Sequence, residues 1–264
     1  IINKPVMKTE DNEDLQFELQ YFHKCAYLII ETATELELNL DVKVFSSAYI
    51  RYFMRDYDAK YTDCRVLVVE ALLEASTRLG QHRKERDIIR TVAKKCRQNF
   101  PGLNKKGEFP DKNIRKAMKQ AIGEDDFSPD EVQEEIERMA SRIGACDRLL
   151  KVAEKVGALI VMLTKMLDSV DTEVIACTSI FIIMRRHNIF EKNCTNPEEW
   201  HKIMETQELF DDIPERADEA NEMFKIFSTN FTGIEKRYIR QQNYESNTVN
   251  IVNPHIPSDS SHPT

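Results

Sequence analysis

The stretch "TEVIACTSIFIIMRRHNIF", residues 172–190, points to the fold class of this chain. Nearly every position from Val174 to Met184 is apolar or small. The stretch is too short and too interrupted by charges to span a membrane, because a spanning helix needs about 20 apolar residues. A helix that is apolar all round is instead buried by other elements. We therefore expect residues 174–184 to form the central helix of a helical bundle.

Neighbouring helices are expected to approach this helix closely, because Ala176, Cys177 and Ser179 are small. The segment "NPEEW" follows at residues 196–200 and holds the one tryptophan of the chain, Trp200. A tryptophan contributes a large apolar surface to a core. We predict that Trp200 covers one end of the bundle as a structural residue, in preference to binding a partner.

The whole chain has the composition of a helical protein. Its 264 residues include only 7 Gly and 9 Pro, while 31% are charged and 41% are hydrophobic. Good helix formers such as Glu, Lys, Ala and Leu dominate, which predicts an all-α fold. The net charge of −8 argues against direct nucleic-acid binding, because neutralising phosphates requires surplus Lys and Arg.

Apolar residues that recur every three or four positions predict a first set of helices. Asp41 is expected to cap the second helix and Thr62 or Asp63 the third. Gly80 is expected to end the third helix as its C′ residue. The segment "VLVVEALLEA" (66–75) is apolar around most of its circumference, so the third helix is predicted to be central. The segments that show this pattern are residues 15–33, 45–53, 64–80 and 85–96.

A second set of helices is predicted after a surface loop at residues 98–111. Pro129 is expected at the first helical position of this set, and the long helix that follows is expected to break near Gly144 or Gly157. Towards the C-terminus the composition becomes polar and Pro-rich, which predicts a partly disordered tail. The predicted organisation is an N-terminal extension at 1–14, two helical sets at 15–127 and 128–232, and the tail at 233–264.

No motif of a known catalytic site is present in the sequence. It has no Gly-rich phosphate loop, GxSxG, HExxH or EF-hand loop, and "EDD" at 124–126 is interpreted as a solvated helix end. His187 and His201 could in principle join Cys177 or Cys194 around a metal, but their spacing matches no known zinc finger. We therefore predict a binding or regulatory protein rather than an enzyme, with no cofactor and no metal.

The cysteines form no CxxC pair, and most fall on the apolar phase of helical patterns, which predicts buried reduced thiols. They are Cys25, Cys64, Cys96, Cys146, Cys177 and Cys194. Because the sequence holds no signal peptide and no run of 18 apolar residues, we predict a nuclear or cytoplasmic protein without membrane contact. The chain starts at Ile1 rather than at a methionine, so we expect a segment to precede it.

Residues 46–96, "SSAYIRYFMRDYDAKYTDCRVLVVEALLEASTRLGQHRKERDIIRTVAKKC", resemble in order and spacing the first cyclin box of transcription-type cyclins, the T, K and Q groups. In those cyclins an aromatic-rich second helix precedes the central helix, and a charged linker leads to a "DII"-type fourth helix, here residues 87–89. The segment "DTEVIACTSIFIIMRRHNIF" (171–190) is similar to the central helix of their second box. Trp200 stands where they carry a Trp-containing segment, and "DEANEMFKIF" (218–227) falls where their last helix lies.

The resemblance covers about residues 15–232 and implies two tandem cyclin-box five-helix bundles. It implies a non-catalytic regulatory subunit that forms a heterodimer with a cyclin-dependent kinase and activates it, in the transcriptional group that acts on the tail of RNA polymerase II. Such a cyclin packs its third to fifth helices against the αC helix of the kinase. The residues expected at this interface are Leu73, Thr77, Arg78, Gly80, His82, Arg83, Lys84 and Met118, the charged "HRKER" (82–86) lying on the rim.

The sequence departs from the family where a Lys and a following Glu pair help to hold the kinase. Thr77 stands at the Lys position and Leu79 and Gly80 at the Glu pair, while the glutamate usual in the fifth helix falls near Met118. Arg78 could supply the cation, although Arg and Lys differ in reach and geometry. Two other functions therefore stay open. One is a cyclin-fold scaffold or adaptor without kinase activation, such as a meiotic cyclin-like protein, and the other is an unrelated all-α viral or adaptor protein.

Overall fold

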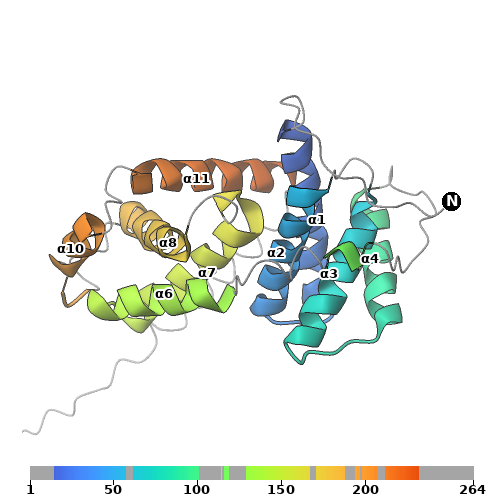
Figure 1. Ribbon diagram of the computed structural model, residues 1–264, viewed down its shortest axis with the longest axis horizontal. Helices are drawn as coiled ribbons and strands as arrows, with labels where there is room; N and C mark the ends of the chain where they lie inside the picture. The colour runs from blue at the N-terminus through green and yellow to red at the C-terminus, as the bar shows by residue number, and fades with distance from the viewer. Residues whose placement is uncertain are drawn as a thin grey trace, which may run out of the picture. The chain divides into compact units, whose positions relative to one another are not determined.

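The computed structural model is helical in the part of the chain that it describes (Figure 1). That part comprises residues 15–57, 62–100, 114, 116–118, 129–166, 171–187, 194–196, 198–206 and 212–231. No strand is formed within these residues, so the predicted all-α class is confirmed. The helices are α1 (Leu15–Glu35), α2 (Leu40–Asp56), α3 (Cys64–Arg78), α4 (Glu85–Asn99), α6 (Pro129–Arg142), α7 (Asp147–Leu163), α8 (Thr172–His187), α10 (Glu198–Thr206) and α11 (Asp212–Asn230).

The chain forms two compact units, Ile1–Phe224 and Lys225–Thr264. The first contains every labelled helix up to α10 and the greater part of α11. Both predicted helical sets begin within it, and the predicted boundary at residues 127/128 stays a prediction. The predicted tail at 233–264 and the string at 124–126 lie outside the described residues, as does most of the predicted loop at 98–111.

In the first set, α3 is the inner helix. It packs against α1, α2 and α4, and every residue from 64 to 72 is buried. Because this run is longer than two helical turns, it covers the whole circumference of the helix. The predicted burial of α3 on all sides is therefore confirmed. Asp63 caps α3, as predicted, since its carboxylate accepts a hydrogen bond from the Arg65 backbone N–H at 2.9 Å.

The helix α2 is also buried on all sides, which its sequence does not predict. Every residue from 44 to 54 is buried, because α2 packs against α1 and α3 on one side and against α6 and α7 on the other (Figure 1). Polar groups are enclosed with the apolar ones. The Ser46 hydroxyl donates to the Ala71 carbonyl at 3.3 Å, and the Arg51 guanidinium lies 4.8 Å from the centre of the Phe22 ring. Through α2, the first set of helices is joined to the second.

A buried histidine makes a second connection between the two sets. His23 of α1 lies with its Nε2 3.0 Å from the carbonyl oxygen of Leu163 at the end of α7. Burial, and secondarily the charge of Arg51, lowers the pKa of His23 below its usual value, against the raising effect of this hydrogen bond. The ring is therefore neutral at pH 7 and donates its Nε2–H to the carbonyl.

The N-cap of α2 is Asn39, and the prediction of Asp41 was wrong. Asn39 has the extended backbone of an N-cap, and its side-chain oxygen accepts from the Val42 N–H at 3.0 Å. Asp41 lies in the first turn instead, where Asn39 Nδ2 donates to its carboxylate at 2.7 Å. The positive end of the helix offsets part of the unfavourable burial of this carboxylate.

In the second set, α8 is the inner helix. It packs against α6 and α7, and every residue from 175 to 180 is fully buried. This run exceeds one helical turn, so the predicted burial on all sides is confirmed. Cys177 Sγ lies 3.4 Å from Met139 Sδ of α6, and the Ser179 hydroxyl donates to the Ile175 carbonyl at 2.7 Å.

Of the two glycines at which a break was predicted, Gly144 forms it, with a positive φ of 63° between α6 and α7. Gly157 lies inside α7 and serves close packing. A Cβ at Gly157 would lie 2.6 Å from Ile136 Cδ1 of α6 and 3.2 Å from Ser179 Oγ of α8. Trp200 is 5% exposed, on a helix that packs against α6, which agrees with a structural role, while its predicted place over one end of the bundle stays a prediction.

The short segment of residues 194–196 packs against the α6–α7 turn, and no sequence pattern predicts this contact. The Thr195 backbone N–H donates to the Gly144 carbonyl at 3.0 Å, and the Asn196 N–H donates to the Ile143 carbonyl at 3.0 Å. Residues 194–196 are thereby fixed beside α6, directly before α10 begins.

Candidate functional site

The exposed end of α3 carries most of the residues that the sequence placed at a kinase interface. Thr77 and Arg78 are exposed in its last turn, and Gly80 and residues 82–84 are exposed in the loop that follows. Leu73 is half-buried and shares a helix face with Thr77, four positions later. Together these residues form one surface, which we call the α3-end surface (residues 73, 77, 78 and 80–84).

Met118 does not contribute its side chain to this surface. It is 1% exposed and belongs to the core of the first set, where it packs with residues of α1 to α4. Its thioether is therefore a core group in this structure. Met118 was predicted at the interface because it stands where the family has a glutamate. Here the apolar side chain at that position packs into the core.

Arg78 is held in place by two aromatic side chains of α2. Its Nη1 donates to the Tyr49 hydroxyl at 3.3 Å, and its guanidinium lies 5.2 Å from the centre of the Phe45 ring. Burial raises the pKa of Tyr49, and the hydrogen bond from Arg78 partly offsets this. The positive charge also suits the C-terminal end of α3, where the helix dipole is negative. The result is an exposed cation whose direction is fixed.

The loop after α3 is fastened to the turn between α1 and α2. Gly80 has φ 66° and forms the predicted C′ position, with its N–H donating to the Thr77 carbonyl at 3.2 Å. Gln81 Oε1 accepts from the Asn39 N–H at 3.0 Å, and Arg83 Nε donates to the Leu36 carbonyl at 3.1 Å. The loop is therefore held to this turn through the side chains of Gln81 and Arg83, while residues 82–84 stay exposed.

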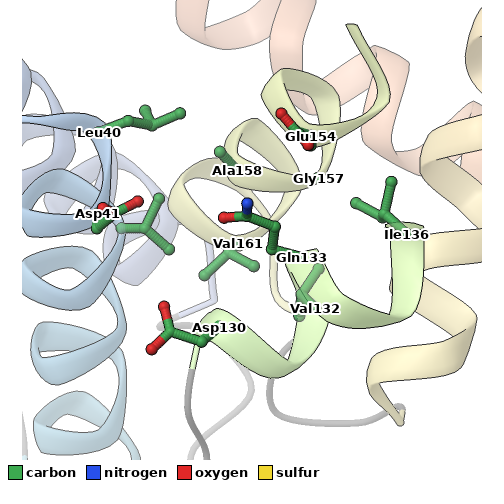
Figure 2. A pocket seen from close by; sticks show the side chains of 11 residues that line it. Leu40, Asp41, Asp130, Val132, Gln133, Ile136, Glu154, Gly157, Ala158 and Val161 are labelled. Carbon is green, nitrogen blue, oxygen red and sulfur yellow. The ribbon is translucent and has the colours of Figure 1, made fainter. Parts of the chain in front are cut away.

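A groove lies between α2, α6 and α7, on the junction of the two helical sets (Figure 2). Its volume is about 190 Å³. The residues that line it are Leu40, Asp41 and Val44 of α2, Asp130, Val132, Gln133 and Ile136 of α6, and Glu154, Gly157, Ala158 and Val161 of α7. Sequence reasoning missed this groove, because its walls come from three helices of which the first is about 90 residues distant from the others.

The carboxylates of this groove are in an unfavourable environment when they are ionised. Burial, and after it the charge of Asp130, raises the pKa of Asp41, although the hydrogen bond from Asn39 opposes the shift. Burial and the charge of Glu137 raise the pKa of Glu154 against the opposing effect of two lysines. In Figure 2, Asp41 and Asp130 lie on the side of the groove towards α2, and Glu154 lies away from them on α7.

The buried thiols are poorly suited to nucleophilic chemistry. Burial raises the pKa of Cys64 and of Cys177 to about 12, so both stay protonated at neutral pH. None of the six cysteines forms a disulfide, and the predicted burial is confirmed for five and wrong for Cys146, which is exposed. Within the described residues, no group of three or more His, Cys, Asp or Glu side chains is placed to hold a metal ion.

Comparison with other proteins adds no relative. Neither a scan against models of protein families nor a search of curated proteins finds a match to this chain. Among the helices of the described residues, none has both the length and the apolar character needed to cross a bilayer.

Proposed function

We propose that this chain is a non-catalytic regulatory subunit that binds and activates a cyclin-dependent kinase of the transcriptional group. The proposal takes residues 15–127 and 128–232 as two tandem cyclin-like boxes. It is supported by the burial of one predicted central helix in each set, α3 in the first and α8 in the second. These helices contain two of the segments that resemble transcription-type cyclins, the central helices of their two boxes.

The observation that carries the proposal is the fixed, exposed cation at the end of α3. Arg78 follows the position at which the family has its kinase-contacting Lys, and Tyr49 and Phe45 hold it in one direction. A side chain that is already ordered loses less entropy when a partner binds. Its planar guanidinium can also form two parallel hydrogen bonds with a carboxylate, which a Lys cannot.

In this proposal the subunit activates by placing a helix of the kinase. The α3-end surface packs against the kinase αC helix and helps to position the Glu that pairs with the β3 Lys. Leu73 supplies an apolar contact near the centre, and the charges of residues 82–84 lie on the rim, as in ordinary protein interfaces.

The test is co-purification of the chain from cell extract, followed by mass spectrometry for a bound kinase. The variants Leu73→Arg and Arg78→Glu should lose the kinase, because each places an unmatched charge in the interface. Arg97→Glu is the matched control, since Arg97 is exposed on α4 outside the α3-end surface. Recovery by wild type and Arg97→Glu alone supports the proposal. A folded wild-type chain that recovers no cyclin-dependent kinase contradicts it.

A second candidate is a cyclin-fold scaffold that does not activate a kinase. It is favoured by Leu79 and Gly80, which stand where the family has its kinase-contacting Glu pair. Leu79 packs against the core of the first set, and Gly80 has no side chain and a positive φ. Neither position can offer a carboxylate to a kinase. Phosphorylation of a peptide substrate by the recovered complex separates the two candidates, because a scaffold would bind a kinase, or another protein, without raising its activity.

A further inference from the structure

The outward face of α4 carries a line of arginines. The opposite face of the helix is buried against α1 and α3, while Arg86, Arg90 and Arg97 are exposed. Steps of four and seven residues bring side chains back to the same side of an α-helix, so these three share one face. We call them the α4 arginine stripe (residues 86, 90 and 97). None of them belongs to the α3-end surface.

Around the stripe, positive charges outnumber the carboxylates that are close to them. Residues 83–97 hold seven Lys or Arg and two acidic residues. Glu31 and Glu35 of α1 add two carboxylates, which pair with Lys95 and Lys94. Three positive charges therefore remain in excess here, in a chain whose net charge is −8. Such an excess attracts an acidic partner to this side of the chain.

The guanidinium groups of the stripe can be reached by carboxylates of a partner. Within the described residues, neither Arg90 nor Arg97 has a carboxylate at ion-pairing distance. Arg97 Nε donates to the Ala93 carbonyl at 3.2 Å, which restrains the direction of its guanidinium. Arg86 lies 3.6 Å from the Asp87 carboxylate, but its side chain is 78% exposed, so this pair is weak.

The exposed residues of α4 favour a protein over a lipid surface or a nucleic acid. All of them are polar or charged. Peripheral binding to a membrane requires apolar side chains that insert between the lipids, and binding of single-stranded nucleic acid usually adds aromatic side chains on which bases stack. The acidic remainder of the chain also repels a long polyanion. A segment with one carboxylate for each guanidinium avoids both problems.

We propose that the α4 arginine stripe binds an acidic helix of a partner protein, whose Glu or Asp residues recur at the same spacing of four and seven positions. Along α4, about 6 Å separate Arg86 from Arg90 and about 10 Å separate Arg90 from Arg97. A helix that lies alongside rises equally per residue, so its carboxylates meet all three guanidinium groups. In an extended strand these distances correspond to about two and about three residues, and a residue three positions further on faces the other side. This inference does not rest on the proposed kinase contact.

The experiment measures fluorescence anisotropy of a labelled, alanine-rich peptide of about 20 residues, a length at which an isolated helix forms. After its first glutamate, further glutamates stand four, seven and eleven positions on, so the peptide presents the spacing of the stripe in either direction. The control peptide has the same composition, with the glutamates on different sides of the helix. We expect a Kd below about 1 mM for the first peptide at about 0.05 M salt. The control peptide should bind about fivefold more weakly, because it forms about one of the three ion pairs.

Two variants locate the site on the protein. Arg90→Glu should weaken binding about tenfold, because it removes one ion pair and adds a repulsion. Arg148→Glu is the matched control, since Arg148 is exposed on α7, and it should bind as wild type does. A peptide with lysine at its two inner glutamate positions should bind Arg90→Glu more tightly than it binds wild type. Thermal unfolding checks that both variants are folded.

Four outcomes overturn the proposal. Equal binding of the two glutamate peptides means that spacing plays no part, and equal loss in Arg90→Glu and Arg148→Glu means that net charge alone acts. Tighter binding of a labelled oligothymidine than of the first peptide assigns the stripe to nucleic acid. A salt-sensitive dimer of the chain alone in sedimentation, lost in Arg90→Glu, assigns it to a second copy of the chain.

Discussion

Alanine substitution at Gly80 and at Gly144 separates the cost of backbone strain from the cost of packing. Both glycines follow a helix as its C′ residue, with φ 66° and φ 63°. Both stand in the same double hydrogen-bond arrangement, in which the N–H of the next residue bonds back to the last helical turn. The two sites therefore share one backbone strain and differ in their surroundings.

At Gly80 the expected cost is strain alone, because a Cβ there would have no atom within 4 Å. A left-handed conformation costs an alanine about 1–2 kcal/mol. The lower entropy of the unfolded chain returns about 0.4–1 kcal/mol. The net destabilisation of Gly80→Ala should therefore be about 1 kcal/mol.

At Gly144 a Cβ would overlap the side chain of Thr195 and would lie 3.2 Å from its backbone N. Thr195 cannot withdraw freely, because its N–H donates to the Gly144 carbonyl and the next residue is also hydrogen-bonded to this turn. Overpacking of this kind costs about 1–3 kcal/mol. Gly144→Ala should therefore cost about 2–4 kcal/mol in total, the strain included.

Thermal unfolding followed by circular dichroism measures both costs, at about 2–4 °C of Tm for each kcal/mol in a chain of this size. In the double variant, Thr195→Ala should recover part of the loss at Gly144, which a double-mutant cycle quantifies. Equal costs at the two glycines would refute the reasoning, because residues 194–196 would then contribute nothing at the α6–α7 turn.

Four further expectations concern the core, the groove and the thiols. Trp200→Ala should cost about 3–5 kcal/mol in urea unfolding, because the side chain is buried on a helix that packs against α6, and unchanged stability would exclude its structural role. Ala176→Leu should cost about 1–3 kcal/mol by overpacking α8, so a Tm equal to that of wild type would contradict the close approach of α6 and α7. Folding raises the pKa of Asp41. Ionisation of Asp41 therefore destabilises the fold fully above its folded pKa and not at all below its unfolded pKa of about 3.9. Asp41→Asn should therefore raise the Tm at pH 7 and leave it unchanged at pH 3. Iodoacetamide should alkylate Cys146 in the folded chain and the five buried thiols only after unfolding, as mass spectrometry of digests can show.

Helix positions and helix ends could largely be predicted from the sequence. The apolar run at 174–184 required a helix covered on all sides, and α8 is such a helix. Gly80 was predicted to end α3 because only glycine adopts a positive φ without strain, and it does so. The error at Asp41 arose because two neighbouring residues can both cap a helix, and the backbone of Asn39 decided between them.

The candidate interface was predicted only in part. Thr77, Arg78 and Gly80 lie together at the end of α3, since they are neighbours in one segment. The contacts that hold Arg78 come from α2, about 30 residues earlier, and no local sequence pattern predicts them. Met118 was expected at the interface and is enclosed in the core. The expectation came from the position of a glutamate in the family, and that position does not tell whether an apolar residue there is buried.

By itself, the sequence of this protein determined which segments are helical, where several of them end and that α3 and α8 are enclosed. These properties follow from periodicity, propensity and capping, which act within a few turns of one segment. Only the tertiary structure decided that α2 is covered on both sides, that residues 194–196 pack at Gly144, and that Asp41 and Asp130 share a groove. These contacts join segments that are far apart in the chain. They depend on how the side chains of two helices pack together, which neither segment determines alone.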